Sequence, residues 1–283
     1  MDISQKDLDD LRRAKYLLEN PGFIAKVTAV VGTPIEYGLK KLPADWQDKV
    51  MAVTHQSLEK AADGALLTLK DVPDEPASNI WHKLSVAATG AAGGFFGFAA
   101  LAIELPISTA IMLRSILDIA RSEGESISSA ETKMECLSVF AFGSTKSNSD
   151  DDSDEGYFAL RATLAGATRE AISALGKSGG DAISKESSSA ILKLIAIIAE
   201  RFGVEVSEKI ALQAIPVVGA IAGATINTLF IDHYQDMARG HFIVRRLIRA
   251  YGVEYIEQQY AALPSKPAEA PPRSTDDVTP EMA

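Results

Sequence analysis

An uncharged run of 22 residues, IALQAIPVVGAIAGATINTLFI (Ile210–Ile231), is followed directly by a dense polar stretch, DHYQDMARGHF (Asp232–Phe242). A second uncharged run, Leu84–Ile103, precedes a similar polar stretch, MLRSILDIAR (Met112–Arg121). Apolar segments of this length reach the span of a bilayer, and in a soluble protein they lie in the core. These two segments therefore constrain the fold more than any other part of the chain.

The composition of the two runs favours a protein core over a bilayer. Both are rich in Gly and Ala, which gain little from insertion into lipid, and Pro216 and Pro106 lie within or beside them. The spacings Gly90–Gly94 and Gly93–Gly97 suit close packing of two helices. We expect a buried Gly/Ala-rich helical hairpin, with a protein that lies on or partly enters a membrane as the alternative.

The remaining segments predict an all-α protein, because almost none alternates with period two and most carry apolar residues at helical spacing. We expect one helical domain over residues 8–260, with two central Gly/Ala-rich apolar helices. Residues 143–156 (GSTKSNSDDDSDEG) predict an acidic, mobile loop, and residues 261–283 predict a disordered Pro-rich tail.

Composition excludes several classes of function. A formal charge of -10 argues against a nucleic-acid-binding protein. The single cysteine, Cys136, lies in an apolar stretch and is expected to be a buried core residue in a reducing cytoplasm. The N-terminus has no apolar segment typical of a secretory signal.

The acidic run at 143–156 lacks the closing glutamate of a calcium-binding EF-hand loop, so we expect no metal ion there. We also expect no cofactor.

The candidate site residues lie in the two polar stretches: Arg114, Asp118, Arg121, Asp232, His233, Asp236, Arg239 and His241. DIAR (Asp118–Arg121) aligns with DMAR (Asp236–Arg239), which suggests that the two apolar helices pack together. One interpretation is a buried ion network in which Arg114 and Arg121 pair with Asp232 and Asp236 and fix the helix register. The alternative is a polar site beside an apolar pocket.

In that alternative, Asp236 and His233 act as an acid/base pair and Arg239 holds an anion, which would serve hydrolysis or the binding of a lipid headgroup. No GxSxG motif and no His–Glu metal motif supports catalysis. The two histidines of the stretch, His233 and His241, are about 12 Å apart along a helix and do not share a metal ion.

Three segments resemble the EcsC protein family: LENPGFIAKVTAVVGTPIEYGLKKLP (Leu18–Pro43), ATGAAGGFFGFAALAIELPISTAIMLRSILDIARSEGE (Ala88–Glu125) and PVVGAIAGATINTLFIDHYQDMARGHFIVRRLIRAYG (Pro216–Gly252). With the helices between them they cover about residues 8–260. The resemblance implies a bacterial protein of undefined activity, from a family named after an operon that also encodes an ABC transporter. It carries over no catalytic residues and favours a membrane-peripheral role.

The sequence thus favours a non-enzymatic cytoplasmic protein, peripheral to the inner membrane, that associates with membrane lipid or a membrane protein. A hydrolase that uses Asp236, His233 and Arg239 is the alternative. We expect no nucleic acid among the partners.

Overall fold

The computed structural model describes residues 2–19, 38–40, 42, 44–68, 97–143, 156–177, 185–214 and 216–264. These residues form helices and no strand, so the predicted all-α fold is confirmed. The helices of this part of the chain are α1 (Gln5–Glu19), α4 (Trp46–Thr68), α6 (Gly97–Ser122), α7 (Ala130–Ser138), the 3₁₀ helix η1 (Val139–Ala141), α8 (Tyr157–Lys177), α9 (Lys185–Gln213), α10 (Pro216–Tyr251) and α11 (Val253–Ala262).

Some expectations lie outside the described residues. They are the spacings Gly90–Gly94 and Gly93–Gly97, all but the two end residues of the acidic segment 143–156, and most of the tail 261–283.

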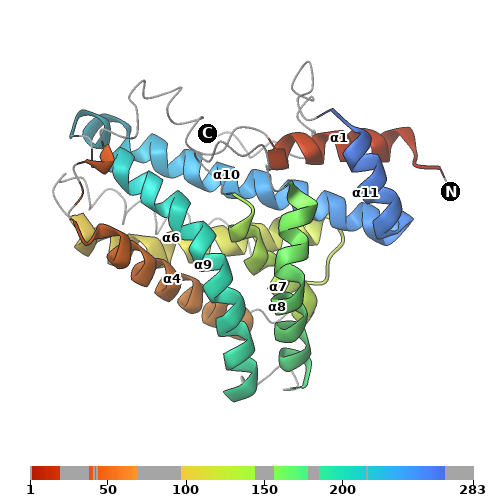
Figure 1. Ribbon diagram of the computed structural model, residues 1–283, viewed down its shortest axis with the longest axis horizontal. Helices are drawn as coiled ribbons and strands as arrows, with labels where there is room; N and C mark the ends of the chain where they lie inside the picture. Colours follow the sequence, from red (N-terminus) through yellow and green to blue (C-terminus); the bar gives the residue numbers. More distant parts are fainter. Residues whose placement is uncertain are drawn as a thin grey trace, which may run out of the picture.

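Helix α10 is the longest described helix and organises the others (Figure 1). Helices α1 and α11 pack on its C-terminal half, and α6 and α9 pack beside it. Helix α4 lies against α6 and α9, and α8 lies against α9 and α7. None of the helices in the described ranges is both long enough and apolar enough to cross a membrane.

The uncharged run at 210–231 is not one continuous helix. Helix α9 extends through Gln213, and α10 begins at Pro216, so the run is divided between the two. Proline is favoured in the first turn of a helix because its missing N–H would have no partner there. The expectation that the whole run forms one apolar helix is therefore wrong. The polar stretch Asp232–Phe242 does continue the second of the two helices, α10.

Helix α6 behaves differently around its proline. It continues through Pro106 and ends at Ser122. The turn that follows contains Gly124, whose φ of 81° places it in the left-handed region that glycine tolerates. Hydrogen bonds from Glu125 N to Ala120 O and from Gly124 N to Arg121 O satisfy the last carbonyls of the helix. This reversal directs the chain after α6 back toward α10.

Helices α6 and α10 lie side by side, as the paired motifs suggested. Gln235 Nε2 of α10 donates a hydrogen bond of 2.9 Å to Ser115 Oγ of α6. A neutral hydrogen bond thus joins the two helices close to the level at which the sequence predicted ion pairs.

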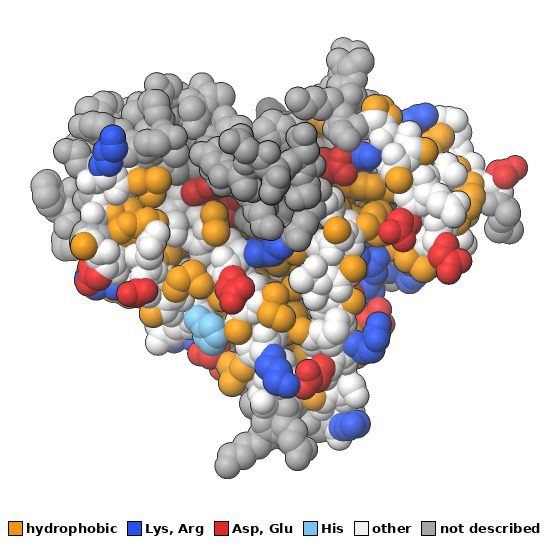
Figure 2. Space-filling view, viewed as in Figure 1, with side chains coloured by type: hydrophobic (Ala, Val, Ile, Leu, Met, Phe, Trp, Pro, Cys, Tyr) orange, Lys and Arg blue, Asp and Glu red, His pale blue; other side chains and the backbone are white. Residues whose placement is uncertain are grey.

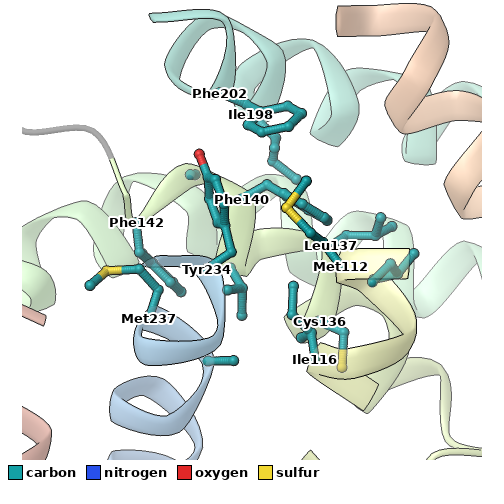
Figure 3. Close-up of a cluster of buried hydrophobic side chains, with 14 of the residues drawn as sticks. Met112, Ile116, Cys136, Leu137, Phe140, Phe142, Ile198, Phe202, Tyr234 and Met237 are labelled. Carbon is teal, nitrogen blue, oxygen red and sulfur yellow. The ribbon is translucent and has the colours of Figure 1, made fainter. Parts of the chain in front are cut away.

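The core between η1, α9 and α10 is aromatic (Figure 3). Phe140 lies between Phe202 and Tyr234, with ring centroids 4.9 and 5.3 Å away, and Phe230 packs 5.3 Å from Tyr234. Tilted and edge-on ring pairs of this kind add to the free energy of burial. Cys136, on the adjacent α7, is buried as expected, and burial raises the pKa of its thiol.

Helix α1 packs closely on α10 because position 240 is a glycine. A Cβ at Gly240 would lie 2.6 Å from Leu18 Cγ and 3.1 Å from the carbonyl oxygen of Ala14. Next to Ala14 on α1 is the buried Lys15. Its Nζ donates to the carbonyls of Tyr260 and Leu263, at 2.9 and 2.8 Å. These carbonyls end α11, where a positive charge is stabilising.

Candidate functional site

The predicted cluster on α6 lies on the outer face of that helix. The side chains of Arg121 and Asp118 are 60% and 47% exposed, and Arg121 Nη2 lies 3.5 Å from Asp118 Oδ1 of its own helix. The prediction that Arg121 pairs in the interior with a carboxylate of α10 is therefore wrong. Arg114 is half-buried, and no ion pair joins it to a carboxylate in the described part of the chain. An exposed pair three residues apart contributes less than about 1 kcal/mol.

The predicted cluster on α10 begins at the exposed Asp232. Asp236 and Arg239 are about one-quarter exposed, and Arg239 Nη1 lies 3.4 Å from Asp236 Oδ1. Burial lowers the pKa of Arg239, and the charge of Asp236 opposes that effect. These two residues therefore pair along their own helix, because residues three apart are neighbours on a helix surface.

His233 is buried, and its Nε2 lies 3.1 Å from the carbonyl oxygen of Gly143. Because a carbonyl only accepts, this nitrogen donates and carries the proton. A Cβ at position 143 would lie 2.6 Å from the same nitrogen, so glycine is needed for the contact. The structure thus gives His233 a packing role at the end of η1, and the acid/base pairing of His233 with Asp236 stays a prediction.

The buried His241 occupies the centre of a hydrogen-bonded chain. Tyr157 Oη of α8 lies 2.8 Å from its Nδ1, and Glu135 Oε2 of α7 lies 3.1 Å from its Nε2. The ionised Glu135 only accepts, so Nε2 carries the proton and Nδ1 accepts from the tyrosine hydroxyl. Burial lowers the pKa of His241, against the opposing effect of Glu135. The imidazole is therefore neutral, and both of its nitrogens are used.

Glu135 also belongs to an ion network around Arg245 of α10. Arg245 Nη1 lies 2.8 Å from Glu135 Oε1, its Nε lies 2.9 Å from Glu125 Oε1, and its Nη2 lies 2.9 Å from Glu131 Oε1. Burial opposes the ionisation of Glu135, yet the hydrogen bond from His241 and the charge of Arg245 lower its pKa to about 2. A guanidinium that contacts three carboxylates holds α10 against α7 and the turn before it.

The next arginine extends the network to the N-terminal helix. Arg246 lies 2.8 Å from Glu123 at the end of α6, 3.1 Å from Asp7 and 2.6 Å from Asp10 of α1. Tyr251 Oη also donates to Asp7, over 2.6 Å. Three segments far apart in the sequence thus meet at one side chain.

Sequence reasoning included His241 among the candidates but missed Arg245, Arg246 and their carboxylates. The pair Arg245–Arg246 in IVRRLIR, and the acidic residues of α1, were the signals available. Neither signal identifies a partner, because the carboxylates are more than 100 residues away along the chain.

A separate ion pair, between a buried lysine and a partly exposed glutamate, joins α9 to α6. Lys209 is buried, and its Nζ lies 2.8 Å from Glu104 Oε1 and 5.0 Å from the ring centroid of Phe230. On the same helix, burial raises the pKa of Glu205 well above its usual range and that of Glu208 to about 7. Burial therefore favours the protonated form of Glu205, which avoids the cost of burying its charge.

These polar groups have the properties of a structural network. His241, Tyr157 and Glu135 are acid/base-capable residues, but His241 and Tyr157 are buried, Glu135 is largely covered, and the three are hydrogen-bonded to one another. Within the described ranges, no group of three or more His, Cys, Asp or Glu residues is arranged to hold a metal ion. We conclude that the network fixes how α1, α7 and α8 pack on α10.

Comparisons with known proteins give one assignment. No curated protein and no solved structure matches the chain. The model of the EcsC protein family matches residues 23–247, which include α4 to α9 and nearly all of α10. The matched region also holds Arg245, Arg246 and the carboxylates of α6 and α7 that they contact. Because the match covers well over half of the sequence, the chain belongs to the EcsC protein family.

Proposed function

We propose that this protein is a non-enzymatic, membrane-peripheral protein that contacts the lipid surface through the outer face of α6. The observation that carries the proposal is that the exposed side chains on this face change from apolar to charged along the helix. Its first half exposes the apolar side chains of Ala102, Ile103, Ile107 and Ala110, whereas its second half exposes Asp118 and Arg121. Ile103 is 68% exposed and Ile107 is 39% exposed, which is high for isoleucine.

The two isoleucines are neighbours on one face, because residues four apart lie one turn apart on a helix. The opposite face of α6 is packed into the core by Leu105, Met112 and Ile116. The exposed side chains are therefore presented on a rigid support. By contrast, hydrophobic and charged side chains are interspersed on the face drawn in Figure 2.

A lipid surface fits this pattern better than a protein groove. The patch is narrow, has no aromatic anchor among its exposed residues and has charged residues at one end, as in helices that lie in the bilayer interface. Full burial of one isoleucine contributes about 1.5–3 kcal/mol. The exposed fractions of Ile103 and Ile107 together equal about one side chain. The expected contribution is therefore about 2 kcal/mol, which is typical of weak, reversible association.

Flotation with phospholipid vesicles tests the proposal. The full chain is mixed with vesicles of phosphatidylcholine and phosphatidylglycerol and centrifuged through a density gradient. We expect wild-type protein to float, Ile103→Glu to stay in the dense fraction, and the matched variant Val253→Glu to float. Val253, on α11, is 48% exposed and lies away from α6, so it controls for the added charge.

Two results would overturn the proposal. One is wild-type protein that stays in the dense fraction, and the other is Ile103→Glu protein that floats like wild type. Light scattering after size exclusion adds a third: a wild-type dimer that Ile103→Glu dissociates would assign the patch to self-association instead.

A further inference from the structure

Arg114 continues the apolar stripe of α6. Ile103, Ile107, Ala110 and Arg114 are spaced by four, three and four residues, which places them on one side of the helix. Arg114 lies seven residues after Ile107, or about 10 Å along the helix axis. It is half-buried, so part of its side chain is accessible to solvent.

The charges near Arg114 on α6 are already compensated. Asp118 pairs with Arg121, and Glu104 pairs with Lys209 of α9. No ion pair of Arg114 itself is found among the residues that the structure describes. Within the part of the chain that the structure describes, the positive charge of Arg114 therefore has no ionic partner, and it lies where the exposed apolar side chains end.

The geometry points to a binding role: Arg114 binds the phosphate of an anionic phospholipid headgroup when the apolar half of α6 contacts the bilayer. This inference rests on the proposed function, since it requires that α6 meets the membrane. A helix that lies in the bilayer interface turns one side toward the lipid, and Arg114 is on the same side of α6 as Ile103 and Ile107. Its long side chain can therefore reach the phosphates while the isoleucines contact the acyl chains. A guanidinium forms two parallel hydrogen bonds to a phosphate, which a lysine ammonium does not.

The expected effect is modest and specific. One basic side chain near an anionic bilayer raises the partition coefficient about five-fold. The formal charge of the whole chain, -10, repels an anionic surface, so the increase must come from a local contact. Phosphatidylglycerol should therefore enhance binding only while Arg114 is present.

Vesicle cosedimentation of the full chain tests the inference. Partition coefficients are measured on pure phosphatidylcholine and on a 3:1 mixture of phosphatidylcholine and phosphatidylglycerol. We expect wild-type binding to increase about five-fold on the mixture, Arg114→Gln to lose that increase and keep its binding to phosphatidylcholine, and Arg114→Lys to retain part of it. The matched control is Arg121→Gln, on the same helix, because Asp118 already pairs with Arg121.

The outcomes separate the two proposals. Wild-type protein that binds neither vesicle removes both of them. Binding that Ile103→Glu abolishes, but whose dependence on phosphatidylglycerol is unchanged in Arg114→Gln, removes only the role of Arg114. An equal loss in Arg121→Gln would also overturn that role, because it would indicate general electrostatic attraction. Circular dichroism of each variant identifies any loss of folding. Arg114→Lys keeps the positive charge, so the part of the increase that it retains measures the contribution of charge alone.

Discussion

Replacing Glu135 by glutamine isolates the contribution of its buried charge. The side chain keeps its size but no longer forms a charged contact with His241 and Arg245, which lie 3.1 and 2.8 Å away. In the folded protein the pKa of Glu135 is lowered from 4.5 to about 2, a difference of 2.5 pH units. At 1.36 kcal/mol per unit, the ionised carboxylate stabilises the fold by about 3 kcal/mol at pH 7.

The pH dependence follows from the direction of the shift. A group whose pKa is lowered on folding stabilises the protein above its unfolded pKa, and the stabilisation is lost as the pH falls through the folded value. For Glu135 the loss occurs between about pH 5 and pH 2, and at pH 3 about 1.4 kcal/mol remains. The difference between wild type and Glu135→Gln should therefore decrease by more than half from pH 7 to pH 3.

Urea unfolding followed by circular dichroism at both pH values measures this difference. Glu131→Gln is the matched control, because Glu131 lies one turn away on α7 and contacts the same Arg245, but its side chain is 60% exposed. We expect that variant to lose less than about 1 kcal/mol. Equal losses in the two variants, or a loss for Glu135→Gln that is the same at pH 3 and pH 7, would refute the assignment of a buried charge.

Two further measurements address other buried groups. Tyr157→Phe removes the 2.8 Å hydrogen bond to His241 Nδ1 and leaves a buried acceptor without a donor, so we expect thermal and urea unfolding to report a loss of about 1–3 kcal/mol. Burial raises the pKa of Glu208 to about 7. The contribution of this one group to the free energy of unfolding is therefore greatest below pH 4.5 and is lost as the pH rises through 7. Glu208→Gln should reduce this fall, and an unchanged dependence of the free energy of unfolding on pH between 5 and 8 would contradict the assignment.

Helical periodicity was sufficient to predict the fold class and several elements. Apolar residues recur at helical spacing over 46–69 and over 157–175, and the structure has α4 and most of α8 in these ranges. The proline positions were harder to interpret. Pro106 lies inside α6, whereas Pro216 begins α10, and both occur in similar apolar surroundings. The difference depends on which neighbours cover each helix, and a local pattern does not contain that information.

The polar site could be predicted only in part. The spacing in DMAR is sufficient to place Asp236 beside Arg239, because both residues lie on one helix. The partners of Arg245 were missed because all three follow α6, beyond its turn at Gly124, and are brought to α10 by the packing of two long helices. Helix periodicity gives the direction of a side chain and leaves open what lies opposite it.

The contacts of Arg246 with Asp7 and Asp10 have a consequence for how the chain acquires its structure. These contacts join residues 239 and 236 positions apart, so α1 cannot complete them until almost the whole chain has been made. At 5–20 residues per second, a ribosome needs about 12–50 s to reach Arg246 after synthesising Asp7. During that interval the amphipathic N-terminal helix has no α10 to pack against, and its docking is one of the last steps of folding.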